Sequence, residues 1–186
     1  MENYESLIER FVKRQEVFDG RVLHVVNDTV RLSDGTESNR EVCLHSGGVC
    51  ILPLLPDGTV IMERQFRYAH GKVFFELPAG KLDYVDEIPL EAAKRELREE
   101  TGAVSAKITP LGKIATTPAL MDEIINVYLA EELTFGECEL DEGEFLILER
   151  VPFKKLYEMV VASEIEDAKT QIAILKTAAL RPWLIK

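Results

Sequence analysis

The chain of 186 residues lacks any uninterrupted apolar stretch near the about 18 residues that a membrane-spanning helix needs. It also lacks the charged start and short apolar segment that are typical of a secretion signal. Cysteine is scarce, and Cys43, Cys50 and Cys138 are odd in number and match no metal-binding pattern. We therefore expect a cytoplasmic protein with reduced thiols, whose role is burial rather than catalysis.

Basic residues are also too few for a positive surface, since 22 lysines and arginines face 33 acidic residues and leave a formal net charge of -11. Such a surface repels phosphate backbones and anionic lipids, so neither a nucleic acid nor a membrane is expected as the main partner. A small anion remains compatible, because a bound cation inverts the local field. His24, His45 and His70 lie far apart in the sequence and lack the spacing of a zinc site.

The residues that are present, 46% hydrophobic and 30% charged, suit a globular chain with one well-developed core. Apolar segments between turn residues predict strands, and apolar residues three and four apart predict helices. Strands are predicted at 49–55, 60–66, 124–130 and 145–151, and helices at 154–162 and 167–179. In the last helix Ile172, Leu175 and Ala179 form the predicted buried stripe. Strands alternating with helices predict an α/β fold, with helices on both sides of a mixed central sheet.

The first 45 residues are predicted to form a small antiparallel β region, ahead of a main domain at 46–186. Residues 4–12 are amphipathic, and strands are expected at 21–32 and 41–45 around the turn at Asp34 and Gly35.

The most informative segment is a predicted helix that begins at Pro89 and ends at Gly102. Proline suits the first helical position, and glycine suits the left-handed residue that ends a helix. Leu90, Ala93 and Leu97 recur at spacings of three and four, so one face of this helix is expected to be buried.

Glu96, Glu99 and Glu100 stack three carboxylates on a neighbouring face of the same helix. Each like-charge pair destabilises a helix by about 0.2–0.5 kcal/mol, and a hard cation would reverse that sign. The preceding segment 74–80, FFELPAG, predicts a short strand and a Pro/Gly turn that bring backbone carbonyls to these acids. The alternative is a solvated face on which neighbouring lysine and arginine neutralise the glutamates.

Residues 95–103, RELREETGA, resemble the REUXEEXGU half of the Nudix box, in which U is a bulky apolar residue. Glu87 stands at the spacing of the first glutamate of the box, with seven residues between it and Arg95. Ala103 is smaller than the usual residue. Six residues instead of five lie between Gly80 and Glu87, which indicates one extra loop residue. The chain is identified as a member of the Nudix hydrolase superfamily, and the resemblance implies the Nudix αβα sandwich.

The resemblance also implies a divalent-metal site and the residues that support it. The implied metal ligands are the Ala79 carbonyl, Glu96, Glu99 and Glu100, with Glu99 direct or through water. The implied supports of the site are Gly80, Glu87 and Arg95, the last two as an ion pair that braces the loop against the helix. Oxygen donors of this kind suit Mg²⁺, with Mn²⁺ as an alternative.

Further segments resemble the ADP-ribose pyrophosphatase subgroup of the superfamily. Residues 140–145, LDEGEF, resemble its mobile catalytic loop, in which Glu142 is the preferred general base and Glu144 the second choice; the alternative is a solvated acidic hairpin. In RQFRY, Arg67 matches an arginine that contacts the substrate phosphate. Glu76 matches an acid near the substrate, with Arg67 as another possible partner. Glu123 matches an acid in a weaker motif, where alanine replaces glycine and a plain proline turn is equally compatible.

The resemblance implies Mg²⁺-dependent hydrolysis of a nucleoside diphosphate sugar, with ADP-ribose cleaved to AMP and ribose 5-phosphate. GDP-mannose, a dinucleoside polyphosphate or FAD are alternative substrates, and a sensor that binds ADP-ribose without cleaving it is an alternative of another class. The retained glutamates argue against the sensor. The subgroup also implies a homodimer, with the N-terminal β region as the dimerisation element and sites that include residues of both chains.

Overall fold

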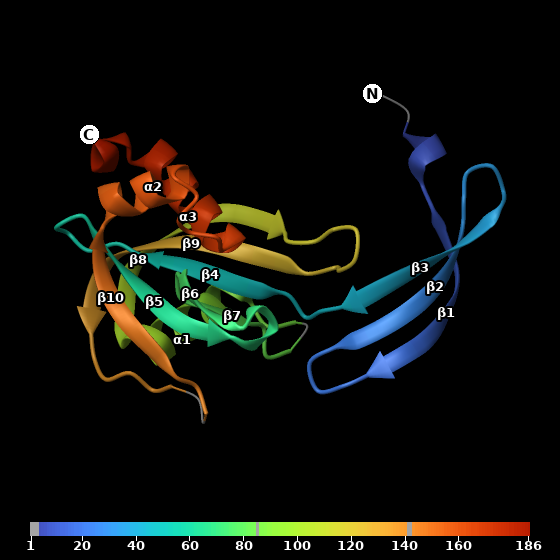
Figure 1. The fold of residues 1–186 in the computed structure, drawn as a ribbon, viewed down its shortest axis with the longest axis horizontal. Coiled ribbons are helices and arrows are strands. Elements are labelled where there is room, and N and C mark those ends of the chain that lie inside the picture. Colours follow the sequence, from blue (N-terminus) through green and yellow to red (C-terminus); the bar gives the residue numbers. More distant parts are fainter. Residues whose placement is uncertain (1–3, 85, 141–142) are drawn as a thin grey trace. The chain divides into compact units, whose positions relative to one another are not determined.

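The computed structural model describes residues 4–84, 86–140 and 143–186. The chain divides into two compact units (Figure 1). One consists of the described residues up to Ser46 together with Ala115–Glu123, and the other of Gly47–Ile114 and Ile124–Lys186. Among the described residues, no helix is long and apolar enough to cross a membrane.

The N-terminal unit is built on an antiparallel sheet in the order β1-β2-β3. A 3-10 turn η1 (Glu5–Leu7) precedes β1 (Arg10–Asp19), β2 (His24–Arg31) and β3 (Glu37–Leu44). Gly35, at φ 87°, supplies the left-handed residue of the predicted turn between β2 and β3. The sequence analysis missed β1 because all ten of its residues are exposed, so no alternation of apolar and polar residues marks it as a strand.

The larger unit contains a four-stranded sheet in the order β7-β4-β9-β8 and a three-stranded sheet in the order β10-β5-β6. Their strands are β4 (Gly48–Pro53), β5 (Thr59–Arg67), β6 (Lys72–Glu76), β7 (Ala79–Lys81), β8 (Ala103–Ala115), β9 (Ile124–Phe135) and β10 (Leu146–Pro152). The first sheet is mixed, since β4 runs parallel to β9 and antiparallel to β7. β5 is antiparallel to both of its neighbours. The predicted segment 74–80 is thus split between two sheets.

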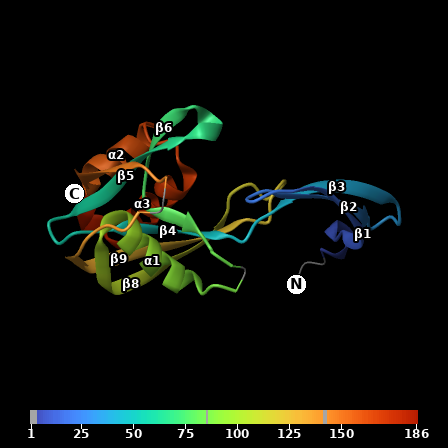
Figure 2. The ribbon, with the colours of Figure 1, turned by 90° about the horizontal axis from the view of Figure 1, so that it is seen from below.

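The helices are α1 (Pro89–Thr101), α2 (Phe153–Val161) and α3 (Ala168–Leu180), with short 3-10 turns η2 (Tyr68–His70) and η3 (Pro182–Ile185). β4 separates two apolar clusters, because successive side chains of a strand point to opposite faces. Ile51 packs in the cluster of Leu97 from α1, whereas Leu52 packs in the cluster of Leu156 from α2 and Ile174 from α3. α1 accordingly lies on one side of β4 and β9 and the other two helices lie on the opposite side (Figures 1 and 2). The predicted αβα sandwich with a mixed sheet is confirmed.

The buried stripe predicted for α3 is wrong. Leu175 is 43% exposed and Ala179 is exposed, and Ile172 is only half-buried. The buried face instead consists of Thr170, Ala173, Ile174, Thr177 and Ala178. Both sets have helical spacing, so periodicity alone does not separate them, and the set with small side chains lets the helix approach the sheet closely.

The cysteines are free, and they differ in burial. Cys50 on β4 is buried, Cys43 is half-buried and Cys138 is exposed. Burial raises the pKa of the Cys50 thiol, which makes it unreactive. The expectation of buried thiols is therefore correct for Cys50 and wrong for Cys138.

Candidate functional site

Helix α1 turns its acidic face inward. It begins at Pro89 and ends at Thr101, and the capping residue Gly102 has a φ of 67°, which no other residue adopts as readily. Glu100 is only 3% exposed, and the side chains of Glu96 and Glu99 are 13% and 25% exposed. These carboxylates therefore do not form the solvated face that was the alternative interpretation.

The segment at β7 lies directly against these acids. The Ala79 backbone N–H donates to Glu100 Oε2 at 3.0 Å. Gly80 has no room for a side chain, because a Cβ atom at this position would overlap the carboxylate of Glu96. The close approach of backbone and carboxylate therefore favours glycine here. The segment lies against the acids as expected, but the backbone group that meets Glu100 is the Ala79 N–H, whereas the sequence predicted carbonyls.

Replacing Gly80 with alanine is expected to displace Glu96, since the flexible carboxylate moves more easily than the β7 backbone. Since Glu96 is proposed as a metal ligand, affinity for Mn²⁺ should fall by about 10- to 100-fold, which is the loss typical of a misplaced ligand. The thermal unfolding temperature should change little. Isothermal titration calorimetry measures the affinity. Gly136→Ala, whose added Cβ would meet only the Gly102 carbonyl oxygen at 3.9 Å, is the control for glycine replacement. An unchanged affinity would contradict the role of Gly80.

Arg95 links the acids of α1 to the loop before it. Its Nη1 lies 2.8 Å from Glu96 Oε1 and 3.1 Å from Glu99 Oε2. Its Nε lies 3.4 Å from Glu87 Oε1, and its Nη2 donates to the Lys81 carbonyl at 3.2 Å. The structure therefore contains the predicted pairing of Arg95 with Glu87, but the closest contacts of the guanidinium are to Glu96 and Glu99.

Strand β5 supplies the opposite wall through alternate residues. Glu63, Gln65 and Arg67 lie on one face of the strand, because side chains two apart point the same way. Gln65 Nε2 donates to Glu144 Oε1 at 3.0 Å, and Arg67 donates to Glu76 through Nε at 2.8 Å and Nη2 at 3.1 Å. Gln65 thus ties the acidic loop before β10 to the strand that carries the predicted phosphate-binding arginine.

Glu76 is held by two cations. It is 2% exposed and accepts hydrogen bonds from Arg67 and from Lys169 Nζ. Lys169 also lies 2.9 Å from Asp167, the residue that caps α3. Burial alone would raise the pKa of Glu76, but the bonds from Arg67 and Lys169 outweigh it and hold this pKa below its ordinary value. Glu76 is therefore an ionised acid whose geometry orients Arg67.

The acids near α1 have the opposite electrostatics. Burial raises the pKa of Glu96 to about 7. The negative charges of Glu99 and Glu144 raise it as well, whereas Arg95 lowers it. Burial also raises the pKa of Glu100, and the charges of Glu63, Glu96 and Glu144 raise it further. These carboxyls hold protons more tightly than free glutamate does, so a divalent cation among them would relieve both their burial and their repulsion.

This arrangement predicts how stability depends on pH when a chelator is present. The pKa of Glu96 is about 7 in the folded protein against an ordinary value of 4.5, so the folded state binds more protons between these values. The free energy of unfolding should therefore fall as pH rises from 4.5 to about 7. Thermal unfolding in EDTA across this range is the measurement. Glu96→Gln should weaken the dependence without abolishing it, because the raised pKa of Glu100 acts in the same direction. Glu91→Gln, on the exposed side of the helix, should leave it unchanged, and a wild-type profile that rises with pH would contradict the assignment.

The residues present fit a divalent cation in their chemistry. They offer carboxylate oxygens in a buried setting, which hard cations such as Mg²⁺ prefer. Among the described residues, no three acidic, histidine or cysteine side chains already point to one common position. The reason is visible in the contacts, because Glu96 and Glu99 are directed to Arg95 and Glu100 to the Ala79 N–H. Binding an ion would require these side chains to reorient toward one position, and each carboxylate has a second oxygen for that purpose.

Two of the predicted residues lie outside the described part of the larger unit. Glu123 belongs to the N-terminal unit, where it accepts a hydrogen bond from Thr116 and lies 3.6 Å from His45 Nδ1. Glu142 lies outside the described residues. Its neighbour in the loop, Glu144, is the acid that the structure places beside β5.

Sequence reasoning missed Glu63, Gln65 and Lys169. Glu63 and Gln65 alternate with apolar or outward residues within the predicted strand 60–66, so the period of two could have placed them on the face of Arg67. Nothing in the local sequence marks Lys169, because its partner Glu76 is 93 residues away.

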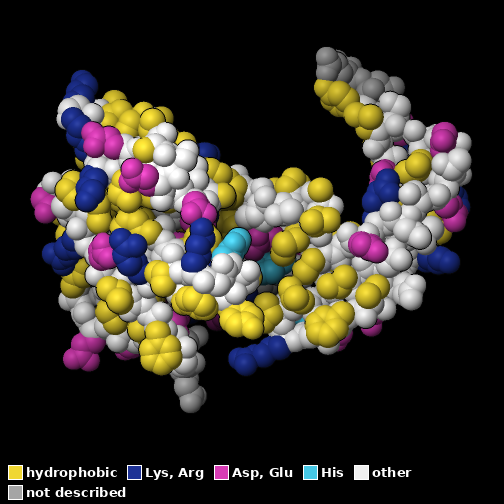
Figure 3. Space-filling model, in the orientation of Figure 1, with side chains coloured by type: hydrophobic (Ala, Val, Ile, Leu, Met, Phe, Trp, Pro, Cys, Tyr) yellow, Lys and Arg dark blue, Asp and Glu magenta, His cyan; other side chains and the backbone are white. Residues whose placement is uncertain are grey.

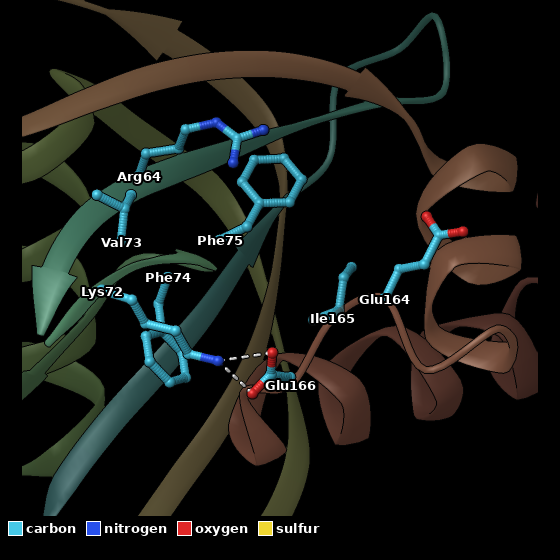
Figure 4. A pocket seen from close by; sticks show the side chains of 8 residues that line it. All are labelled: Arg64, Lys72, Val73, Phe74, Phe75, Glu164, Ile165 and Glu166. Carbon is cyan, nitrogen blue, oxygen red and sulfur yellow. Dashed lines mark hydrogen bonds and ion pairs between the residues drawn. The ribbon is translucent and has the colours of Figure 1, made fainter. Parts of the chain in front are cut away.

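A separate hollow lies beside β6 (Figure 4). Arg64 projects into it over the ring of Phe75, 4.3 Å from the ring centroid, and Lys72 pairs with Glu166 at 2.6 Å. Arg64 points away from the face of Glu63, because the two are adjacent in the strand. None of the acids of α1 lines this hollow.

Residues 44–171 match the family model described as NUDIX domain, and the chain belongs to this family. It is 39% identical over 172 residues to the ADP-ribose pyrophosphatase of Bacillus subtilis (strain 168), covering 91% of this chain and 92% of that one. It is 35% identical over 168 residues to the methanol dehydrogenase activator of Bacillus methanolicus, covering 89% and 90%. The crystal structure of an ADP compounds hydrolase matches with a TM-score of 0.81 at 21% identity, covering 94% of this chain and 95% of that chain, which shows a shared fold. The family membership predicted from the box is confirmed.

Proposed function

We propose that this protein hydrolyses the pyrophosphate bond of a nucleoside diphosphate sugar, with ADP-ribose as substrate and AMP and ribose 5-phosphate as products. The observation that carries the proposal is the buried acidic face of α1, held against β7 and opposite the face of β5 that carries Arg67. The 39% identity to a protein named ADP-ribose pyrophosphatase supports the choice of substrate. The cytoplasm is the location we propose, and Mg²⁺ is the proposed cofactor, with Mn²⁺ as an alternative.

Glu96, Glu99, Glu100 and the Ala79 carbonyl would hold the divalent cation. When bound, such a cation neutralises pyrophosphate charge and lowers the pKa of a coordinated water. Arg67 binds a phosphate oxygen with N–H groups that remain after its two bonds to Glu76, and Lys169 keeps Glu76 ionised for this purpose. Arg95 and Glu87 brace the loop, and Gly80 lets it approach Glu96.

The general base is an acid of the loop before β10. The sequence prefers Glu142, whereas the hydrogen bond from Gln65 supports Glu144, which it holds near the acids of α1. A base must lie within hydrogen-bonding reach of the attacking water, directly or through one further water. We therefore propose Glu144 as the base and keep Glu142 as the alternative.

The test of the function is release of phosphatase-sensitive product from ADP-ribose, GDP-mannose, ADP-glucose, diadenosine polyphosphates, FAD and NADH, with and without Mg²⁺. Selective Mg²⁺-dependent cleavage of ADP-ribose is the expected result. Preference for another compound would move the substrate and retain the reaction. Tight binding of ADP-ribose without cleavage of any compound would contradict the hydrolase and favour a sensor.

We also propose that residues 1–45 are a dimerisation element ahead of the Nudix domain at 46–186. Hydrophobic side chains reach the surface of the N-terminal unit (Figure 3), which supports this proposal. Phe11 and Phe18 on β1 are 63% and 56% exposed. Apolar surface of this kind is typical of a subunit interface.

Lysine at both Phe11 and Phe18 is expected to convert the dimer to a monomer, because an interface core does not tolerate two buried charges. Light scattering coupled to size-exclusion chromatography measures the mass, which should fall by half. Lys13→Gln on the same exposed strand is the control. A monomeric wild-type protein would contradict the proposal.

A further inference from the structure

Glu63 on β5 is a buried acid that the predicted metal site does not include. Its side chain is among the largest that are fully buried, with 0% of the residue exposed. Neither of its carboxylate oxygens has a hydrogen-bond partner within the described part of the chain. Burying a polar group without a partner costs about 1–3 kcal/mol in proteins, and more if it is charged. Packing alone therefore does not account for a glutamate at this position.

The surroundings of Glu63 are the walls of the candidate site. Glu76 is its cross-strand partner on β6, and Arg67 and Gln65 share its face of β5. Glu100 of α1 and Glu144 of the acidic loop both lie close enough to interact with it electrostatically. Glu63 thus lies among the acids of the candidate site, next to the arginine proposed to bind phosphate.

The nearby cations are already engaged by another acid. Arg67 spends two of its N–H groups on Glu76, and Lys169 is bonded to Glu76 and Asp167. Neither forms a hydrogen bond or ion pair with Glu63 among the described contacts. A buried carboxylate that interacts electrostatically with Glu100 and has both oxygens unbonded is suited to a cation that Glu100 also binds.

We propose that Glu63 supplies a further carboxylate to the divalent-cation site. The acids of α1 would bind the ion from one side and Glu63 of β5 from the other. This inference rests on the proposed function of the site. It assigns the ion a ligand from the strand that carries Arg67, so the cation and the phosphate-binding arginine are positioned by one rigid element. An ion bound by residues of both α1 and β5 would also fix the distance between these two elements.

The experiment measures Mn²⁺ binding without substrate, by the loss of the free-ion signal in electron paramagnetic resonance. Glu63→Gln keeps the shape and removes the charge, and its affinity should be weaker than that of the wild type by about tenfold or more, the loss typical of ligand-shell changes. Glu63→Asp keeps the charge on a side chain that is one methylene shorter. Its Mn²⁺ affinity should lie between those of the wild type and Glu63→Gln. The matched control is Glu149→Gln, since Glu149 pairs with Arg64 on the other face of the sheet.

Thermal unfolding in EDTA checks that each variant is folded. The inference is overturned if Glu63→Gln binds Mn²⁺ as tightly as the wild type. If the glutamine variant does not fold, wild-type affinity of Glu63→Asp overturns it instead. These results are distinct from failure of the proposed function, in which the wild-type protein itself neither binds Mn²⁺ nor cleaves any compound of the panel.

Discussion

Replacing Glu100 with glutamine is expected to lower kcat by about 10²- to 10³-fold, the loss typical of removing one group that stabilises charge in the transition state. Glu100 is the most buried acid of α1 and accepts the N–H of Ala79 at 3.0 Å. The glutamine keeps a carbonyl oxygen for that bond, so the loop should stay in place. What is lost is the negative charge that a divalent cation requires.

The fold of Glu100→Gln should be intact and, in EDTA, at least as stable as the wild type. The variant removes an acid whose ionisation is opposed by burial and by Glu63, Glu96 and Glu144. Steady-state kinetics at several Mg²⁺ concentrations separate a weaker metal affinity from a slower reaction. Glu91→Gln on the same helix is the matched control, because Glu91 is exposed and pairs with Lys94 at 2.8 Å. Near wild-type rates for Glu100→Gln would remove Glu100 from the metal site.

Replacing Glu144 with glutamine is expected to lower kcat by about 10²- to 10⁴-fold, which is the range of a lost general base. Mn²⁺ affinity should change much less, because the proposed role of Glu144 is to take a proton from water. The two readouts together separate a lost base from a lost metal ligand, because loss of a ligand would also weaken Mn²⁺ binding. Gln65 lies 3.0 Å from Glu144, so Gln65→Ala should also lower kcat, by releasing the loop.

The comparison that decides the base is Glu144→Gln against Glu142→Gln. If the sequence-based preference for Glu142 is right, Glu142→Gln loses kcat by this factor and Glu144→Gln keeps a rate near that of the wild type. Glu139→Gln is a matched control in the same loop, because Glu139 is exposed and pairs with Arg98 at 3.0 Å. Equal, small effects of both main variants would place the base outside this loop.

The sequence by itself determined the acidic helix and its limits. Pro89, Gly102 and the spacing of Ala93 and Leu97 act over one to four residues, and local rules of this kind survive in any tertiary setting. The same holds for the strands that flank the turn at Gly58 and for the αβα class. The box spacing was sufficient for the family, which the match over residues 44–171 confirms.

Only the tertiary structure decided which face of α3 is buried and which acids of the site meet. The two candidate stripes of α3 have the same periodicity, and contact with the sheet selects the one with small side chains. Gln65 and Glu144 are 79 residues apart, and Lys169 and Glu76 are 93 apart. Local sequence does not encode such pairs, because they depend on how β5, β6, β10 and α3 pack. The buried, unpartnered state of Glu63 follows from the same packing.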